Sequence, residues 1–261
     1  MNKLGVNYNV ATQMTPAEAF ALFASLGFDA VFTGYFGSTA AMEPFAAEAA
    51  RNGLLYESFH APFGHINDIW LPGDGGDQMQ KELTDCITSA GALAVPIVVI
   101  HLSSGEHPPY DFDLGHKRWD VVVDCAVRCG VTVAFENQRK LANLAYAMEL
   151  YADVPQVGFC WDVGHEKCFA NGMEYMPLFG KRLVYTHIHD NFRVHGGDLH
   201  MIPFDGGIDY SVTASHLKKA GYTGTLTLEL LPKKSPAYAD VPNEVFYQRA
   251  YDAAVRLRGM L

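Results

Sequence analysis

Six apolar segments of this sequence end on a residue that can bind a metal ion. These residues are His60 in FHAPF, His101 in VVIHL, Glu136 in VAFEN, Asp162 in CWDVGH, His187 in YTHIHDN and Glu229 in LTLEL. Imidazole nitrogens and carboxylate oxygens are common ligands of divalent cations. If the segments are parallel strands of one barrel, their ends meet at one mouth, so residues far apart in sequence share one site. We therefore expect a divalent metal centre there.

Three more side chains extend this set. Asp162 and His165 are three residues apart in WDVGH, so both can point into one cavity. Asp198 and His200, in GGDLH, belong to a loop that is long enough to fold back over the barrel mouth. Taken alone, Asp198 and His200 would be solvent-exposed residues of a loop. Likewise, a DxxH spacing such as that of Asp162 and His165 often arises by chance. His165, Asp198 and His200 are candidates for additional metal ligands.

The segment THIHDN offers a second histidine beside the strand-end residue His187. His187 and His189 alternate, and a strand sends alternate side chains to the same face. Asp190 follows and is a candidate partner that orients an imidazole.

Strand patterns and helix patterns alternate along the whole chain. The predicted strands cover residues 4–8, 30–33, 57–60, 96–101, 131–136, 157–162, 182–189 and 225–230. The predicted helices cover residues 15–27, 39–52, 77–94, 116–129 and 139–151, a short segment before residue 180, and residues 209–220 and 242–259. This order predicts an α/β fold, a (β/α)8 TIM barrel, with residues 1–261 as a single domain. The alternative, an open doubly wound sheet, needs a glycine-rich phosphate turn after the first strand, and YNVATQM is not one.

The amino-acid composition argues against nucleic-acid and membrane partners. Acidic residues outnumber basic ones 29 to 19, a net charge of −10, which repels nucleic acid and anionic membranes. No apolar run approaches the roughly 20 residues of a membrane span. The N-terminus, MNKLGVNYNV, lacks the long apolar stretch of a secretory signal. We expect a cytoplasmic protein without nucleic-acid or membrane partners, and whether it forms a homo-oligomer is left open.

The cysteines agree with a reducing compartment. Cys86, Cys125, Cys129, Cys160 and Cys168 are an odd number without CxxC spacing. They are typical of reduced core thiols. The last two flank the WDVGH motif, so a thiolate metal ligand is a second interpretation.

The motifs FHAPF, VIHLSS, FEN, WDVGH, HIHD, DLH and LEL resemble the xylose isomerase-like barrel superfamily over nearly the whole chain. That superfamily holds sugar isomerases, ketose 3-epimerases and DNA-repair enzymes of the endonuclease IV type. The resemblance to the epimerase branch implies one divalent ion held by Glu136, Asp162, His187 and Glu229. It also implies substrate contacts from His165 and Arg193. A further glutamate of that branch falls on Ala142, which argues against 3-epimerase activity in the narrow sense.

The endonuclease branch implies a cluster of three zinc ions, and this sequence fills all of its ligand positions. The matching residues are His60, His101, Glu136, Asp162, His165, His187, Asp198, His200 and Glu229. The DNA-intercalating groups of that branch are not evident in the sequence, and the net charge of −10 opposes DNA binding. The number of metal ions therefore stays open between one and three.

The resulting hypothesis is a metal-dependent sugar isomerase or epimerase. Glu136 and Glu229 exchange a proton with a carbon next to a carbonyl, through a metal-bound enediolate. The histidines favour Mn, Zn or Co, and Mg is not excluded. Phe63 and Trp161 are expected to wall the sugar pocket, with core packing as the alternative for each. Arg193 is the one basic group placed near the site, which favours a neutral sugar.

An alternative uses the same ligands for different chemistry. With two or three ions the protein would be a hydrolase or a lyase, either an endonuclease IV-like phosphodiesterase or a keto-glycoside lyase. A metal-binding protein without catalysis is the third hypothesis, but a closed structural site does not need an open barrel mouth.

Overall fold

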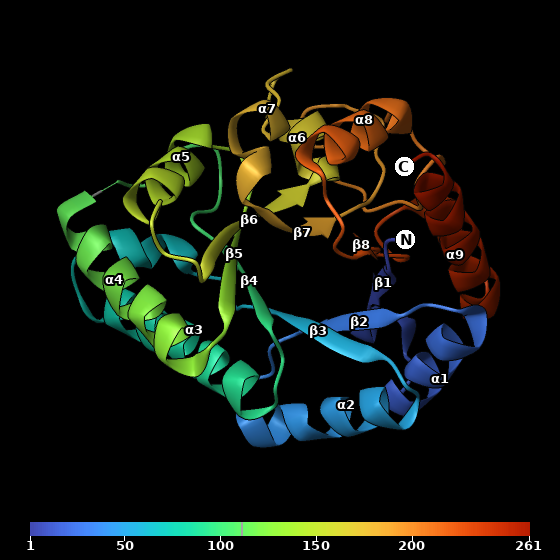
Figure 1. The fold of residues 1–261 in the computed structure, drawn as a ribbon, viewed down its shortest axis with the longest axis horizontal. Helices are drawn as coiled ribbons and strands as arrows, with labels where there is room; N and C mark the ends of the chain where they lie inside the picture. Colours follow the sequence, from blue (N-terminus) through green and yellow to red (C-terminus); the bar gives the residue numbers. More distant parts are fainter. Residues whose placement is uncertain (111) are drawn as a thin grey trace.

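A ring of eight parallel strands forms the centre of the protein, and helices surround it (Figure 1). The computed structural model describes residues 1–110 and 112–261. The strands are β1 (Leu4–Asn7), β2 (Ala30–Gly34), β3 (Leu55–His60), β4 (Ile97–His101), β5 (Thr132–Glu136), β6 (Val157–Asp162), β7 (Leu183–His187) and β8 (Leu226–Leu228). The helices are α1 (Pro16–Leu26), α2 (Thr39–Arg51), α3 (Asp74–Ala92), α4 (Phe112–Cys129), α5 (Leu141–Leu150), α6 (Val163–Phe169), α7 (Met176–Phe179), α8 (Tyr210–Ala220) and α9 (Asn243–Gly259). Short 3-10 helices are η1 (Val10–Thr12), η2 (Ile66–Trp70), η3 (Gly180–Arg182) and η4 (Pro236–Tyr238).

The sheet closes on itself. Its strand order is β7-β6-β5-β4-β3-β2-β1-β8, and the first and last strands meet through a parallel bridge between Ile188 and Leu228. The Ile188 N–H donates to the Thr227 carbonyl at 2.9 Å, and the Glu229 N–H donates to the Ile188 carbonyl at 3.2 Å. The prediction of a (β/α)8 barrel is confirmed, and the open doubly wound sheet is wrong.

The junction between β7 and β8 is shorter than the sequence pattern predicts. We expected strands over residues 182–189 and 225–230, but the regular ladders end at His187 and Leu228. The Thr186 hydroxyl accepts a hydrogen bond from the Thr227 N–H at 3.2 Å and donates to the Thr225 carbonyl at 3.0 Å. A side chain thus replaces backbone partners at this seam, and the ladder is interrupted there.

Local sequence explains where helices begin and end, as α1 shows. Thr15 and Glu18 form a capping box, in which each side chain accepts a hydrogen bond from the other residue's backbone N–H. Pro16 occupies the first turn, where its missing N–H costs nothing. Gly27 ends the helix at φ 101°, in the left-handed region that favours glycine.

Apolar side chains fill the barrel interior below its mouth. Val99, Ala134, Cys160 and Tyr185 are buried there in one cluster. Larger apolar side chains, among them Trp119, fill the layer between strands and helices. All five cysteines are free thiols, and all except Cys129 are buried. This agrees with the prediction of core thiols. In the part of the chain that the structure describes, no helix is both long and apolar enough to span a bilayer.

Candidate metal centre

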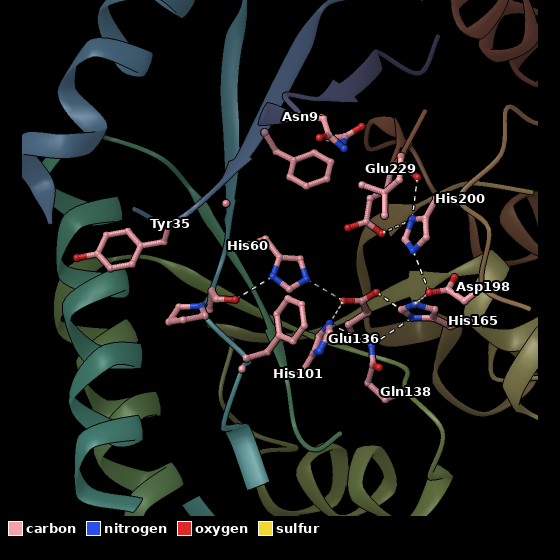
Figure 2. Close-up of a pocket in the computed structure, with 18 of the residues that line it drawn as sticks. Asn9, Tyr35, His60, His101, Glu136, Gln138, His165, Asp198, His200 and Glu229 are labelled. Atoms are coloured by element: carbon pink, nitrogen blue, oxygen red, sulfur yellow. Dashed lines mark hydrogen bonds and ion pairs between the residues drawn. The ribbon is translucent and has the colours of Figure 1, made fainter. Parts of the chain in front are cut away.

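The predicted strand-end residues gather at the carboxyl end of the barrel (Figure 2). His60, His101, Glu136, His165 and Glu229 line one cavity of about 640 Å³. Two further members of the set, on β6 and β7, lie fully buried in the same cluster; they are Asp162 and His187. The convergence expected from the strand pattern is therefore present in the fold.

Four imidazoles surround the carboxylate of Glu136. Its Oε2 lies 2.8 Å from His101 Nε2 and 3.4 Å from His60 Nε2. Its Oε1 lies 3.2 Å from His165 Nδ1 and 3.4 Å from His187 Nδ1. Burial by itself would raise the pKa of Glu136, but the charges of the neighbouring histidines and their hydrogen bonds outweigh it and hold the pKa well below its ordinary value. This carboxylate therefore stays ionised at the centre of the cluster.

A first group of four ligand atoms comes from Glu136, Asp162, His187 and Glu229, all within 4.8 Å of one another. The Nδ1 of His187 lies 3.4 Å from Glu136 Oε1 and 3.5 Å from Glu229 Oε2. Glu229 Oε2 is buried and has no hydrogen-bond partner. Two ligand atoms on one ion at about 2.1 Å are separated by about 3.0 Å in octahedral and 3.4 Å in tetrahedral coordination. The observed separations are long for hydrogen bonds and fit the edges of such a coordination shell.

A second group comprises His165, His189, Asp198 and His200, again within 4.8 Å of one another. Asp198 Oδ2 lies 3.1 Å from His200 Nε2 and 3.7 Å from His165 Nε2. Asp198 Oδ1 and His189 Nδ1 are buried without hydrogen-bond partners. The loop that carries Asp198 and His200 does fold back over the mouth, and the donor set of this group also fits a cation.

Burial and charge act against each other on the histidines of both groups. Burial lowers the pKa of His187, but Glu229 and Glu136 outweigh it and raise the pKa to about 9. Burial likewise lowers the pKa of His165, while Asp162, Asp198 and Glu136 together raise it well above its usual value. The centre thus holds an excess of negative charge, which a divalent cation would neutralise.

The end of β6 and the start of α6 determine the positions of Asp162 and His165. The Asp162 carboxylate accepts a hydrogen bond from the His165 backbone N–H and begins helix α6. Asn137, which follows Glu136, donates from its side chain to the Asp162 carbonyl at 2.8 Å and accepts from the Asp162 N–H at 2.8 Å. These bonds lock the ends of β5 and β6 together.

Our sequence reasoning missed Gln138, and it placed His189 on the face of His187 without assigning it as a ligand. Gln138 Nε2 lies 3.1 Å from both His101 Nε2 and His165 Nδ1, so it bridges two imidazoles. His189 lies 3.2 Å from Asp162 Oδ2 and belongs to the second ligand group. The signal for both was their sequence position, since Gln138 comes two residues after a strand-end ligand and His189 two residues after another.

The prediction for Asp190 is wrong. Its carboxylate orients no imidazole, because it accepts hydrogen bonds from four backbone N–H groups. The donors are Asn191, Phe204, Gly206 and Ile208. Asp190 instead holds the ends of the loop that delivers Asp198 and His200.

Of the three other predicted substrate contacts, the structure places one in the cavity and two outside it. Phe63 lines the cavity, with its ring 4.4 Å from that of His101. Trp161 is fully buried on the opposite face of β6 and donates from Nε1 to Glu166 at 2.9 Å. Arg193 is exposed and borders a different depression of about 380 Å³. Neither Trp161 nor Arg193 is brought to the cavity.

Comparisons with known proteins agree with this fold. The D-psicose 3-epimerase of Clostridium cellulolyticum H10 superposes with a TM-score of 0.80 at 16% identity, over 99% of each chain. The 3-keto-D-glucoside 4-epimerase YcjR of E. coli superposes with a TM-score of 0.75 at 17% identity, over 99% of this chain and 100% of that one. At such identities the likeness concerns the fold.

Sequence comparisons show the family to which the chain belongs. The uncharacterized protein y4fM of Sinorhizobium fredii (strain NBRC 101917 / NGR234) is 29% identical over 233 residues, which cover 84% of this chain and 68% of that protein. The family profile described as xylose isomerase-like TIM barrel matches residues 20–247. Since this match covers most of the barrel, the chain belongs to the xylose isomerase-like TIM barrel family.

Proposed function

We propose that this protein is a divalent-metal-dependent isomerase or epimerase, which moves a proton at a carbon next to a carbonyl in a sugar or sugar derivative. One observation carries the proposal: Glu136 and Glu229 both border the cavity and both contact the imidazole of His187. They come from β5 and β8, which are separated by β6 and β7 around the barrel. Two carboxylates on different strands can reach a bound sugar from different directions.

Glu136, Asp162, His187 and Glu229 would hold the ion. When bound, a divalent ion stabilises the negative charge that develops on substrate oxygens as the proton leaves the neighbouring carbon. The mixture of imidazole and carboxylate donors suits Mn, Zn or Co, with Mg as a weaker choice. The second ligand group leaves the number of ions between one and three.

The carboxylates of Glu136 and Glu229 would exchange the substrate proton, one accepting it and the other returning it. Burial raises the pKa of Glu229, but His187 and His200 outweigh this and lower it to about 2. Glu229 is therefore ionised at neutral pH, but so low a pKa makes it a weak base, which a bound cation would offset by acidifying the substrate. Two imidazoles, His187 and His200, lie 3.5 and 3.4 Å from Glu229 Oε2, whereas four surround Glu136, so Glu229 is the better placed acceptor.

The comparisons support a sugar as the substrate. Two solved structures with this fold are described as a D-psicose 3-epimerase and a 3-keto-D-glucoside 4-epimerase. Both names describe a change of configuration in a carbonyl-containing sugar. The absence of a glutamate at Ala142 still argues that this chain acts on something other than a simple ketose.

A second candidate is a metal-dependent hydrolase or lyase, either an endonuclease IV-like phosphodiesterase or a keto-glycoside lyase. The group His165, His189, Asp198 and His200 favours it, because it offers a second cation position beside the first. The net charge of −10 opposes DNA as the substrate.

Deuterium exchange separates these candidates. The Mn-loaded protein is incubated in deuterated water with D-psicose, D-tagatose and a 3-keto-glucoside, and deuterium beside the carbonyl is measured by NMR. We expect Glu229→Gln to reduce exchange by at least about 100-fold while the fold is retained. Glu244→Gln, on the exposed start of α9, is the matched control and should exchange normally. Full exchange in Glu229→Gln contradicts the proposal, and loss of the aglycone from the 3-keto-glucoside without exchange favours the second candidate.

A further inference from the structure

The cavity at the barrel mouth has two unlike ends. One end holds the ligand groups described above. The other end is built by the loops after β1, β2 and β3, and its apolar side chains are Tyr8, Val10, Phe36 and Pro62, while Phe63 lines the same cavity and packs against His60 and His101. In Figure 2 the labelled carboxylates and imidazoles lie together, while Tyr35 lies apart from them. A ligand that fills the cavity therefore meets metal-binding groups at one end and apolar surface at the other.

The apolar end is exposed although it is firmly held. Val10 is 63% exposed, Phe63 47% and Phe36 43%. Phe36 stacks on Phe45 with ring centroids 5.1 Å apart, and Phe63 packs 4.4 Å from the ring of His101. Preformed apolar surface that borders a cavity is typical of a site that an apolar part of a ligand covers.

Charge at the cavity does not suit a phosphorylated sugar. Within the described lining residues the cationic side chains, apart from the histidines, are Arg139 and Lys234. Arg139 Nε lies 3.2 Å from Glu106, and its guanidinium stacks 4.0 Å from the ring of Phe169. Lys234 Nζ lies 2.7 Å from Asp198 Oδ2. Each of these cations is already paired with a carboxylate, so neither offers an uncompensated charge to a phosphate, and the cavity favours a neutral ligand.

The size of the cavity argues against a free monosaccharide. If each of the twelve heavy atoms of a hexose occupied the volume of a liquid water molecule, the sugar would fill roughly 360 Å³, which is an upper bound. The cavity measures about 640 Å³. The cavity therefore has room for a second group beside the sugar.

We propose that the substrate is a neutral keto-glycoside, whose sugar ring carries the carbonyl, with an apolar, aromatic aglycone. Its sugar lies at the ligand groups, and its aglycone packs against Val10, Phe36 and Phe63. This rests on the proposed function for the identity of the sugar end, and it adds the part of the substrate that the apolar end recognises.

Binding to the Mn-loaded protein tests the proposal without turnover. Calorimetry compares phenyl glucoside, methyl glucoside of the same anomeric configuration, and glucose 6-phosphate. We expect the phenyl glucoside to bind about ten-fold more tightly than the methyl glucoside, since burying the ring removes apolar area from water. Phe36→Ala should reduce this preference to about three-fold or less. Phe192→Ala, at a phenylalanine that is 58% exposed outside the cavity, is the control and should keep the preference.

Equal affinities for the two glucosides, tightest binding of glucose 6-phosphate, or no measurable binding of the phenyl glucoside overturns the proposal. An unchanged preference in Phe36→Ala does the same. The proposed function fails separately: a phenyl preference without deuterium exchange on any sugar supports the aglycone site and rejects the isomerase. Exchange on free ketoses without a preference for the phenyl glucoside supports the isomerase and rejects the aglycone site.

Discussion

The Asp162 carboxylate accepts a 2.6 Å hydrogen bond from the backbone N–H of His165. The same carboxylate belongs to the first group of candidate metal ligands. One side chain therefore begins helix α6 and supplies charge to the centre, and these two roles can be separated by substitution.

Asp162→Asn should retain the helix start and weaken the metal centre. Asparagine caps helices about as well as aspartate, but it lacks the negative charge that a cation requires. We expect metal retained after dialysis to fall at least ten-fold, with little change in thermal stability of the metal-free protein. Asp162→Ala removes the cap as well and should cost about 1 kcal/mol more in unfolding free energy. Elemental analysis and thermal melts measure both, and full metal content in Asp162→Asn would contradict the ligand assignment.

Gly164→Ala should disturb the second ligand group. An added Cβ at this position would overlap the imidazole ring of His189, which is fully buried. Overpacking of this kind costs about 1–3 kcal/mol, and the ring must move away from Asp162. We expect a lower melting temperature and reduced metal content. Gly259→Ala, where an added Cβ meets nothing within 4 Å, is the matched control. Equal stability and metal content in the two variants would show that His189 can relocate freely.

Glu57→Gln should stabilise the protein at neutral and alkaline pH. Burial raises the pKa of Glu57, and the hydrogen bond from Thr225 offsets this only in part. Because the folded pKa lies above the unfolded value of about 4.3, the carboxyl group favours folding below that pH and loses this contribution as pH rises through its folded pKa. Glutamine does not ionise, so its contribution to the free energy of unfolding does not fall as the pH rises. Urea unfolding of both proteins at about pH 4 and pH 8 should show a difference that grows with pH, and a constant difference would contradict this.

Metal removal should lower stability without unfolding the barrel. An ion present at 100 times its Kd stabilises the folded state by about 2.7 kcal/mol. For a chain of this size that corresponds to a fall in Tm of roughly 5–10 °C after chelation. Differential scanning fluorimetry with EDTA, followed by addition of Mn, Zn or Co, measures the loss and its recovery. An unchanged Tm under both conditions would count against a resident cation.

Much of the candidate site could be predicted because strand periodicity and strand direction are local properties. His101 and Glu136 end apolar runs, and parallel strands bring such ends to one mouth whatever the loops do. The same periodicity could have excluded Trp161, since neighbouring residues on a strand face opposite sides and Asp162 points inward. Aromatic character alone did not distinguish a pocket wall from the layer under the helices.

Loop geometry could not be predicted in this way. Arg193 and Asp190 belong to the segment after β7, whose course depends on which backbone groups pair across 18 residues. Asp190 was close in sequence to an imidazole, but four backbone N–H groups compete for it and prevail. The two-ended cavity also follows from packing between loops that are distant in sequence.

The amino-acid sequence by itself determined the alternation of strands and helices, the closed barrel, and the chemical type of the residues at the strand ends. Those features depend on hydrophobic periodicity and capping, which act over a few residues. Only the tertiary structure decided which side chains share a ligand group, that His189 and Gln138 join them, and that Arg193 does not. Such choices depend on distances between segments far apart in the chain, which packing and loop hydrogen bonds set together.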